Sequence, residues 1–356
     1  MHRKYLINLF LKKILLISLI FLSLVFIMNL FEEISFFKDI SSNIILPIIT
    51  TFLNAPSILY IIFPFIFLIS AQLFFIDLIE KNELELLKIN GYTNIKILTI
   101  IASLSFILGI IIIIFFYNFS SKLKFIYLEM KNKHSLDDKY LAVINQNGLW
   151  IKDVVGSETF IVNATKIEEE NLKNVIITIF DNDFNVKKII SSDSVNIAQN
   201  NWKIKDPLIF KGNISEKLNK EMNLLLNFDI AKINRLFKNL SSLNFYQLYR
   251  LKKDYTNINY SFQEIDLHIK KIISFPFYLT IMSILSSIIM LNIKRNNSQI
   301  SYIFIGILSS VTIYYVNVLF QTLGKNGTIP LDLSIWMPVI ILSAITSIGL
   351  VRINEK

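Results

Sequence analysis

The stretch Asp77–Lys96, DLIEKNELELLKINGYTNIK, lies between two long apolar runs and is too polar to cross a bilayer. Four apolar residues give it an apolar side: Leu84, Leu86, Leu87 and Ile89. Gly91 is typical of the residue that ends a helix. The sequence therefore predicts a short helix, over about residues 77–91, caught between two membrane spans.

The two central glutamates of this helix differ in their neighbours. Glu85 has Lys81 four residues before it and Lys88 three residues after it, so it can pair within the helix. Glu83 has no cation at these spacings. A carboxylate in that position suits an interface in which another chain supplies the cation. A solvated glutamate at the membrane surface is the alternative interpretation.

The composition is that of a membrane protein. Of the 356 residues, 53% are hydrophobic and the mean hydropathy is +0.52, and the apolar residues come in blocks of membrane-spanning length. The net charge is +9, but much of the excess flanks apolar segments, where positive charge sets topology, so we expect no nucleic acid partner. The chain has no cysteine and three scattered histidines, which argues against thiol chemistry and a histidine metal site.

Six apolar runs are long enough to cross a hydrocarbon core of about 30 Å as helices. The first is longer than the apolar core of a signal peptide, so we expect it to be retained. The expected spans are Tyr5–Phe31, Phe52–Ile76, Ile97–Phe119, Ile272–Leu291, Ile300–Leu323 and Leu333–Val351.

The lysines and arginines of the short loops predict the orientation. They gather before span one, between spans two and three, between spans four and five, and after span six. The short loops of the opposite side contain only Lys38 and Lys325. Because positive loops stay in the cytoplasm, both termini and the 77–91 helix are expected there, with the long insert after span three outside.

The insert is rich in short β-prone runs separated by turn-forming residues, which predicts consecutive antiparallel strands in a sandwich or jelly roll. The expected strands are Gly148–Asp153, Thr159–Ile167, Asn174–Asp181, Val186–Ile197 and Asn201–Phe210. After them, Ser241, Ser242 and Leu243 are expected to begin a helix near the membrane surface. We expect residues 1–120 to hold spans one to three, 121–240 the β domain, 241–271 a juxtamembrane connection and 272–356 spans four to six.

One expected strand is apolar on both faces, at Ile176, Ile177, Ile179 and Phe180. One alternating set can pack a core while the other meets a greasy ligand, and a fully buried strand explains the pattern equally well.

The chain lacks the chemistry of an enzyme. It contains no P-loop, no G-x-S-x-G elbow and no H-E-x-x-H, and we expect no cofactor. The interiors of the spans carry almost no charge, which argues against an ion-coupled transporter. Two classes fit: the permease of a transporter whose ATPase is a separate chain, and a membrane-anchored sensor or scaffold. The helix at 77–91 supplies a docking element for an ATPase and favours the permease.

Several motifs together resemble the lipopolysaccharide-export permeases of the LptF/LptG (YjgP/YjgQ) type. Asn82–Thr93, NELELLKINGYT, resembles the family's S-E-L-x-x-x-[RQ]-x-x-G-x-[ST], with Glu83 and Gly91 on its glutamate and glycine. Gly148–Asp153, GLWIKD, is similar to the G-L-W-x-[KR]-D that opens the family's jelly roll, particularly in the LptG branch. The resemblance covers essentially the whole chain, and Pro56, Pro64 and Pro276 match family prolines.

The resemblance implies a fold and a set of partners. It implies six spans (three plus three) around an inserted periplasmic β-jelly roll, in the inner membrane of a Gram-negative bacterium. It implies a cytoplasmic ATPase dimer of the LptB type, a second permease of the LptF type, a single-span subunit and periplasmic bridge of the LptC and LptA types, and lipopolysaccharide as cargo. Permeases of another mechanically coupled ABC class, such as lipoprotein release, are the alternative, but they typically have fewer spans.

The resemblance also implies roles for particular residues. Contact with the ATPase falls on Glu83, Leu84, Leu87, Lys88 and Gly91, and the slide for acyl chains falls on the β domain, at Ile176, Ile177, Ile179 and Phe180. The G-type family has several basic residues at the outer end of span one that are thought to meet head-group phosphates. This chain departs from that pattern, because only Lys38 is basic there, beside Asn29, Glu32, Glu33 and Asp39.

Overall fold

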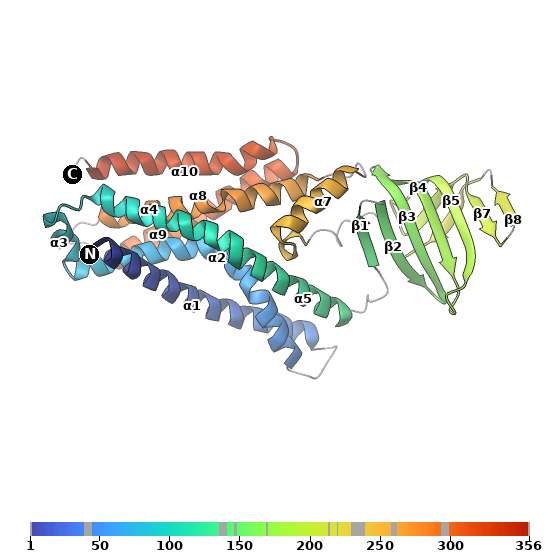
Figure 1. Ribbon diagram of the computed structural model, residues 1–356, viewed down its shortest axis with the longest axis horizontal. Helices are drawn as coiled ribbons and strands as arrows, with labels where there is room; N and C mark the ends of the chain where they lie inside the picture. Colours follow the sequence, from blue (N-terminus) through green and yellow to red (C-terminus); the bar gives the residue numbers. More distant parts are fainter. Residues whose placement is uncertain are drawn as a thin grey trace. The chain divides into compact units, whose positions relative to one another are not determined.

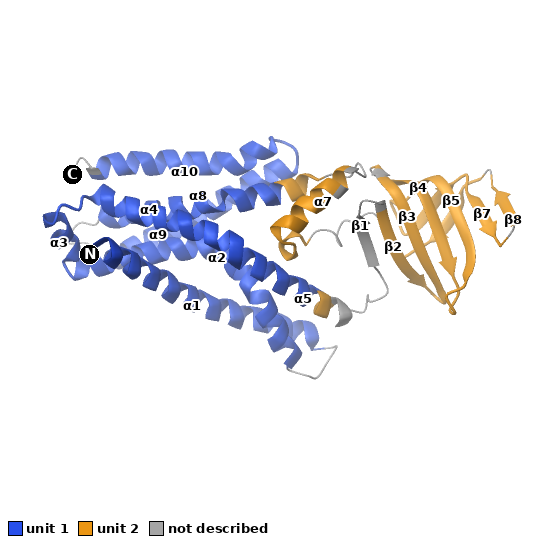
Figure 2. Cartoon of the chain, viewed as in Figure 1, with its two compact units in different colours: residues 1–128, 267–356 blue, residues 129–266 orange. Residues whose placement is uncertain are grey.

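The computed structural model describes residues 2–38, 45–134, 141–145, 148–168, 170–212, 214–218, 220–228, 239–257, 262–292 and 299–354. The chain divides into two compact units, which are coloured separately in Figure 2. The helical unit comprises residues 1–128 and 267–356, and the β unit comprises residues 129–266.

Six helices are long and apolar enough to span a membrane, which confirms the six expected spans. The third is continuous from α4 through a π-helical segment, η1, into α5 (Figure 1). Short elements separate the spans: α3 (Glu83–Ile89) follows α2, and η2 (Leu240–Ser242) and α7 (Phe245–Asn257) precede α8. The long helices are α1 (His2–Phe37), α2 (Ile45–Glu80), α4 (Asn94–Ile111) with η1 (Ile112–Tyr117) and α5 (Asn118–His134), α8 (Gln263–Leu291), α9 (Gln299–Lys325) and α10 (Leu331–Asn354).

The helices α2 and α8 form the centre of the helical unit. In each of them 61% of the most apolar window is buried, against 17% in α1 and α9. Small residues allow the close packing: the hydroxyl of Ser286 donates to the carbonyl of Leu68 at 2.7 Å, and the hydroxyls of Ser105 and Ser283 are 2.9 Å apart. Ser283 and Ser286 therefore belong to a face of α8 that packs against neighbouring helices.

Three departures from regular helix converge on one apolar cluster. Pro64 lies within α2 and Pro276 within α8, and η1 replaces α-helix in the third span. A Cβ on Gly109, just before η1, would stand 2.7 Å from the Cα of Pro276, so glycine is required for this approach. The cluster that they surround contains Ile17, Leu59, Phe63, Ile66, Phe67, Phe275 and Leu279.

The β unit contains one curved antiparallel sheet in the order β1-β2-β3-β4-β5-β6-β9, with β7 and β8 extending from β5 (Figure 1). Together with the six spans it confirms the predicted fold class, a helical membrane protein with an inserted β domain. The strands are β1 (Leu141–Asn145), β2 (Gly148–Val155), β3 (Glu158–Glu168), β4 (Asn171–Phe180), β5 (Val186–Asn196), β6 (Asn201–Lys205), β7 (Leu208–Lys211), β8 (Ile214–Lys217) and β9 (Met222–Leu225).

Two polar side chains of the sheet bind the segment that follows β9. The carboxylate of Asp153 on β2 accepts from the backbone and side-chain nitrogens of Asn227, at 2.7 and 3.1 Å, just beyond β9. The indole of Trp202 on β6 donates to the carbonyl of Phe228 at 2.6 Å. Because β2 and β9 are far apart in strand order, the bonds between Asp153 and Asn227 require the sheet to curl around its apolar face.

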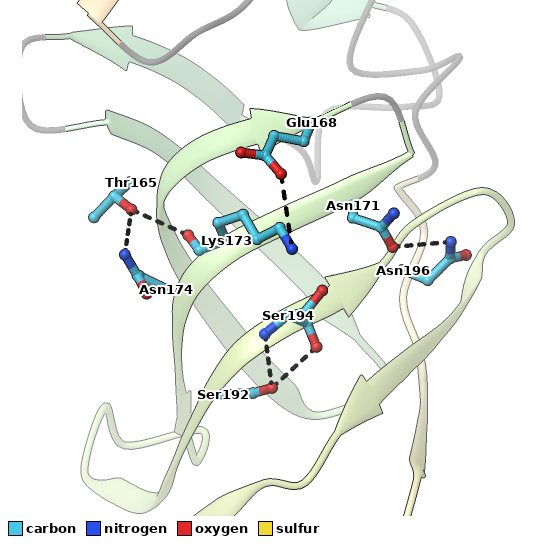
Figure 3. A network of polar contacts seen from close by, with 8 residues as sticks. All are labelled: Thr165, Glu168, Asn171, Lys173, Asn174, Ser192, Ser194 and Asn196. Carbon is cyan, nitrogen blue, oxygen red and sulfur yellow. Dashed lines mark hydrogen bonds and ion pairs between the residues drawn. The ribbon is translucent and has the colours of Figure 1, made fainter.

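The outer surface of β3, β4 and β5 carries a network of polar contacts (Figure 3). The amide of Asn174 donates to the hydroxyl of Thr165 at 3.1 Å, and Asn196 donates to Asn171 at the same distance. Lys173 lies 3.7 Å from Glu168, and both side chains are substantially exposed. These polar contacts between neighbouring strands support the register of the sheet.

Two local predictions were wrong. The single strand expected over Asn201–Phe210 is two strands, β6 and β7, which pair with opposite ends of β5. The break falls at Asp206, which has a positive φ of 45°, and at Pro207, which has no N–H to donate. The helix expected to begin at Ser241 begins instead after Asn244, whose side chain accepts from Gln247 N at 2.8 Å while Gln247 returns the bond.

Candidate functional site

The helix α3 is shorter than the sequence predicts and is bounded by turns at both ends. Asp77–Glu80 continue α2, and Asn82, with φ of 55°, turns the chain into α3. At the other end, Gly91 N donates to the carbonyl of Lys88 at 3.0 Å, and Tyr92 N donates to that of Leu87 at 2.9 Å. This is a Schellman cap, and the φ of 79° at Gly91 explains why glycine stands there.

One side of α3 packs against the helical unit. Leu87 is buried and Leu84 is half-buried, and both join a cluster that includes Leu6 of α1, Phe75 of α2 and Ile97 of α4. Leu84 and Leu87, which sequence reasoning assigned to the contact with an ATPase, therefore hold α3 to its own chain.

The other side of α3 is exposed and partly apolar. Leu86 is 56% exposed and Ile89 is 81% exposed, beside the exposed Glu85 and Lys88. Sequence reasoning noticed Leu86 and Ile89 but did not assign them to the contact, because spacing alone does not tell which side of a seven-residue helix meets the core. Among the residues that the structure describes, Glu85 forms no ion pair with Lys81 or Lys88.

Glu83, at the start of α3, is held by α1. The hydroxyl of Tyr5 donates to a carboxylate oxygen of Glu83 at 2.5 Å. Nearby, Lys13 of α1 pairs with Asp77 of α2 at 2.7 Å. The Glu83 side chain is half-buried, so its second oxygen still has access to a group outside the chain. Its position depends on the first two turns of α1.

Both termini reach the same end of the helical unit as α3. Leu6 of α1 and Leu350 of α10 pack in the cluster that holds Leu87, and the ring of His2 contacts that of Tyr92. Figure 1 shows the N-terminus, the C-terminus and α3 together at this end of the helices. The opposite end of the helical unit is called the far end below.

At the far end, Lys38 is exposed and directly follows α1, while Asp39 lies outside the described residues. A polar cluster that sequence reasoning did not assemble lies within the helices there. Lys124 of α5 donates to Asn54 of α2 at 2.5 Å, and Asn54 donates to Asn29 of α1 at 2.9 Å. Next to it, Tyr127 of α5 donates to the buried Glu33 of α1 at 2.8 Å.

Two more far-end lysines were also missed, because their partners lie on other spans. Lys270 of α8 pairs with Asp332 of α10 at 2.7 Å. Lys271, which is exposed, donates to the amide oxygen of Gln321 of α9 at 3.3 Å, so its charge is not neutralised by that contact. The only sequence signal was the presence of two lysines at the start of an apolar run.

The two faces of β4 separate the four residues that sequence reasoning grouped. Ile177 and Ile179 are buried in the curl of the sheet, whereas Ile176 is 46% exposed and Phe180 is half-buried on the other face. This alternation makes β4 a half-buried strand rather than a fully buried one.

Nothing in the described part of the chain points to metal chemistry. Within those residues, no group of three or more histidine, aspartate or glutamate side chains is placed to hold an ion.

Comparison with known proteins agrees with this architecture. A comparison with curated proteins finds no match for the chain. The family model described as "Lipopolysaccharide export system permease LptF/LptG" matches residues 4–352, which is nearly the whole chain. Members of this family are permease subunits and not enzymes. Together with the family match, the six apolar helices indicate a multi-pass inner membrane protein. The chain belongs to the LptF/LptG family of lipopolysaccharide export permeases.

Proposed function

We propose that this chain is the permease subunit of an ABC transporter that extracts lipopolysaccharide from the inner membrane and passes it to a periplasmic bridge toward the outer membrane. The observation that carries the mechanism is α3: a short helix that is fixed to three spans on one side and presents Leu86 and Ile89 on the other. A rigid element with an apolar exposed face is what transmission of force from a separate ATPase requires.

In this proposal, α3 and both termini lie in the cytoplasm and the β unit lies in the periplasm. The distribution of short-loop lysines and arginines supports this orientation. The packing of Leu6, Leu87 and Leu350 in one cluster adds support, because it ties α3 and both termini to a single side.

The ATPase, a cytoplasmic dimer of the LptB type, receives Leu86 and Ile89 in an apolar pocket. Glu83 and Lys88 supply charges at the rim of that contact, while Leu84 and Leu87 transmit movement to α1, α2 and α4 and Gly91 fixes the end of the helix. A second permease of the LptF type contributes an equivalent helix, and subunits of the LptC and LptA types receive the lipid. Assignment of this chain to the LptG branch rests on Gly148–Asp153.

The lipid path follows from the charges and the apolar faces of each unit. Lys38 and Lys271, both exposed at the far end, meet the phosphates of the head group, since no carboxylate among the described residues forms an ion pair with either lysine. The inward residues of β4, Ile177 and Ile179, line the slide for acyl chains.

Gentle detergent purification of the tagged chain, with protein and lipid mass spectrometry, tests the proposal. An ATPase, a second six-span permease and lipopolysaccharide are expected together. The double substitution Leu86→Asp with Ile89→Asp is expected to lose the ATPase and keep the second permease, whereas Lys81→Gln, outside α3, keeps both. Recovery of the chain alone, or with signalling partners and ordinary phospholipid, would refute the proposal.

A further inference from the structure

A groove lies beside α3, separate from the exposed face of α3 that is proposed to contact the ATPase. It has a volume of about 510 Å³ and runs along α4. Arg3 of α1 and Tyr92 contribute to its lining. The rest of its lining along α4 comes from one stripe of that helix: Ile95, Lys96, Thr99, Ile100 and Ser103. The groove is therefore charged at the end near α3. Further along α4 it carries no charge, and the hydroxyls of Thr99 and Ser103 are already bonded to carbonyls of the same helix.

Two cations stand at the charged end. Lys96 donates one hydrogen bond to the carbonyl of Gly91 at 3.1 Å, which holds its ammonium at the end of α3 and leaves two protons for other acceptors. Within the described residues, neither Arg3 nor Lys96 has a carboxylate within ion-pair distance. An anionic ligand would therefore complement the positive charges of Arg3 and Lys96 at this end of the groove.

The length of the groove identifies the kind of anion. Ser103 is seven residues beyond Lys96, which places it about 10 Å further along the helix axis. That part of α4 belongs to an apolar membrane span, where a protein approaching from the aqueous side does not reach. A ligand that occupies the whole groove needs an anionic head and an apolar tail.

We propose that this groove binds an anionic phospholipid of the cytoplasmic leaflet, such as phosphatidylglycerol, with its phosphate between Arg3 and Lys96 and an acyl chain along Ile100 and Ser103. Zwitterionic phospholipids fit less well, because their own cation would lie beside two others. Assignment to the cytoplasmic leaflet rests on the orientation in the proposed function.

The bound lipid would bridge α1 and α4 next to the Schellman cap of α3. Arg3 precedes Tyr5, which holds Glu83, and Lys96 contacts the carbonyl of Gly91. The lipid therefore stabilises the two elements that position α3, and the anionic lipid content of the membrane sets how firmly α3 is anchored.

The absence of cysteine makes a local measurement direct. The substitution Ile107→Cys gives the full-length chain a single thiol one turn beyond Ser103, on an exposed position of α4. A fluorophore at that thiol is titrated in detergent with phosphatidylglycerol or phosphatidylcholine brominated in the acyl chains. Quenching reports a lipid tail next to residue 107, one turn beyond the last residue that lines the groove.

Phosphatidylglycerol is expected to quench at lower concentration than phosphatidylcholine. Arg3→Gln and Lys96→Gln should each weaken the apparent affinity for phosphatidylglycerol by roughly fivefold, as expected for one cation at a membrane surface. Arg3→Lys should restore most of it. The matched control is Lys4→Gln, which removes an exposed charge next in sequence that does not line the groove. Ser103→Phe should reduce quenching with both cations intact, because it fills the uncharged part.

Equal quenching by the two lipids would overturn the proposal. So would an effect of Lys4→Gln as large as that of Arg3→Gln, which would indicate a diffuse surface charge, or indifference to Ser103→Phe. The measurement needs neither ATPase nor lipopolysaccharide, so its failure is separate from failure of the proposed function. The side of the membrane is checked separately, by labelling of Lys81→Cys with an impermeant thiol reagent in intact cells.

Discussion

The hydroxyl of Tyr5 and the carboxylate of Glu83 are 2.5 Å apart although 78 residues separate them in sequence. The contact joins the first turns of α1 to the first residue of α3, so movement of α3 acts on the first span directly. The Glu83 carboxylate, which the sequence predicts to contact a partner chain, therefore also forms a hydrogen bond within its own chain.

The two roles of Glu83 can be separated by substitution. Tyr5→Phe removes the hydrogen bond and keeps the charge, while Glu83→Gln keeps an acceptor for Tyr5 and removes the charge. Tyr5→Phe should speed hydrogen exchange of the α3 amides, since a partly exposed bond of this kind contributes about 1 kcal/mol. Glu83→Gln should leave exchange unchanged and lower the ATPase activity of the assembled complex.

Glu83→Ala removes both roles and is expected to abolish coupling of ATP hydrolysis to transport without unfolding the permease. A variant complex that assembles and transports at the normal rate would show that Glu83 has no part in the interface.

Gly91→Ala should destabilise the end of α3 by about 1 kcal/mol. The cause is conformational and not steric, because the φ of 79° disfavours a side chain while a Cβ there would meet no atom within 4 Å. Gly91→Asn is the matched variant and should cost less, since asparagine tolerates the left-handed region. Amide exchange of α3 measures both, and equal losses would contradict the explanation.

Gly109→Ala should lower the thermal stability of the chain in detergent, at a cost of about 2 kcal/mol. Its Cβ would stand 2.7 Å from the backbone of Pro276, which cannot move without shifting α8. Gly349→Ala is the control, because its Cβ would meet only side-chain ends of Ile288, at 3.0 Å. If the two substitutions were equally mild, α4 and α8 would be packed less tightly than described.

Lys124→Met keeps the length of the side chain and removes the donor to Asn54. We expect a loss of about 1–2 kcal/mol, because the oxygen of Asn54 is left without its cation in a buried setting. Lys122→Met, at an exposed position of the same helix, is the control and should be nearly neutral. A double-mutant cycle with Asn54→Leu should give a coupling of about 1 kcal/mol, and additive losses would show that the contact contributes nothing.

Photoreactive residues on β4 test the acyl slide. Adducts with lipopolysaccharide are expected at Ile177 and Ile179, which face the curl of the sheet, and not at the outward Ile176. Adducts at the outward position alone would place the lipid outside the sheet, and their absence at all of these positions would leave β4 a structural strand.

Most of the fold could be predicted from local patterns in the sequence. The six spans follow from apolar length, and the turns between the strands follow from turn-forming residues such as Gly156, whose φ is 64°. The end of α3 follows from Gly91. These predictions succeeded because each depends on residues that are neighbours in the chain.

The candidate site was harder to predict from the sequence, because its contacts join segments that are distant in the chain. The bonds of Tyr5 to Glu83 and of Lys124 to Asn54 each join residues that no local pattern relates. Which side of α3 faces inward depends on where α1 and α4 lie, so Leu87 and Leu86 could not be told apart from sequence. Pro207 was a visible signal for the break between β6 and β7 that was not weighed.

The π-helical segment η1 fixes the rotational phase of everything after it in the third span. Its hydrogen bonds enclose one more residue per ring than those of an α-helix, and one residue corresponds to about 100° of turn. Lys124 and Tyr127 face Asn54 and Glu33 only in that phase. A switch of η1 to regular α-helix would rotate α5 about its own axis. The rotation would break the contacts of Lys124 with Asn54 and of Tyr127 with Glu33 together, and would turn Lys124 toward the bilayer.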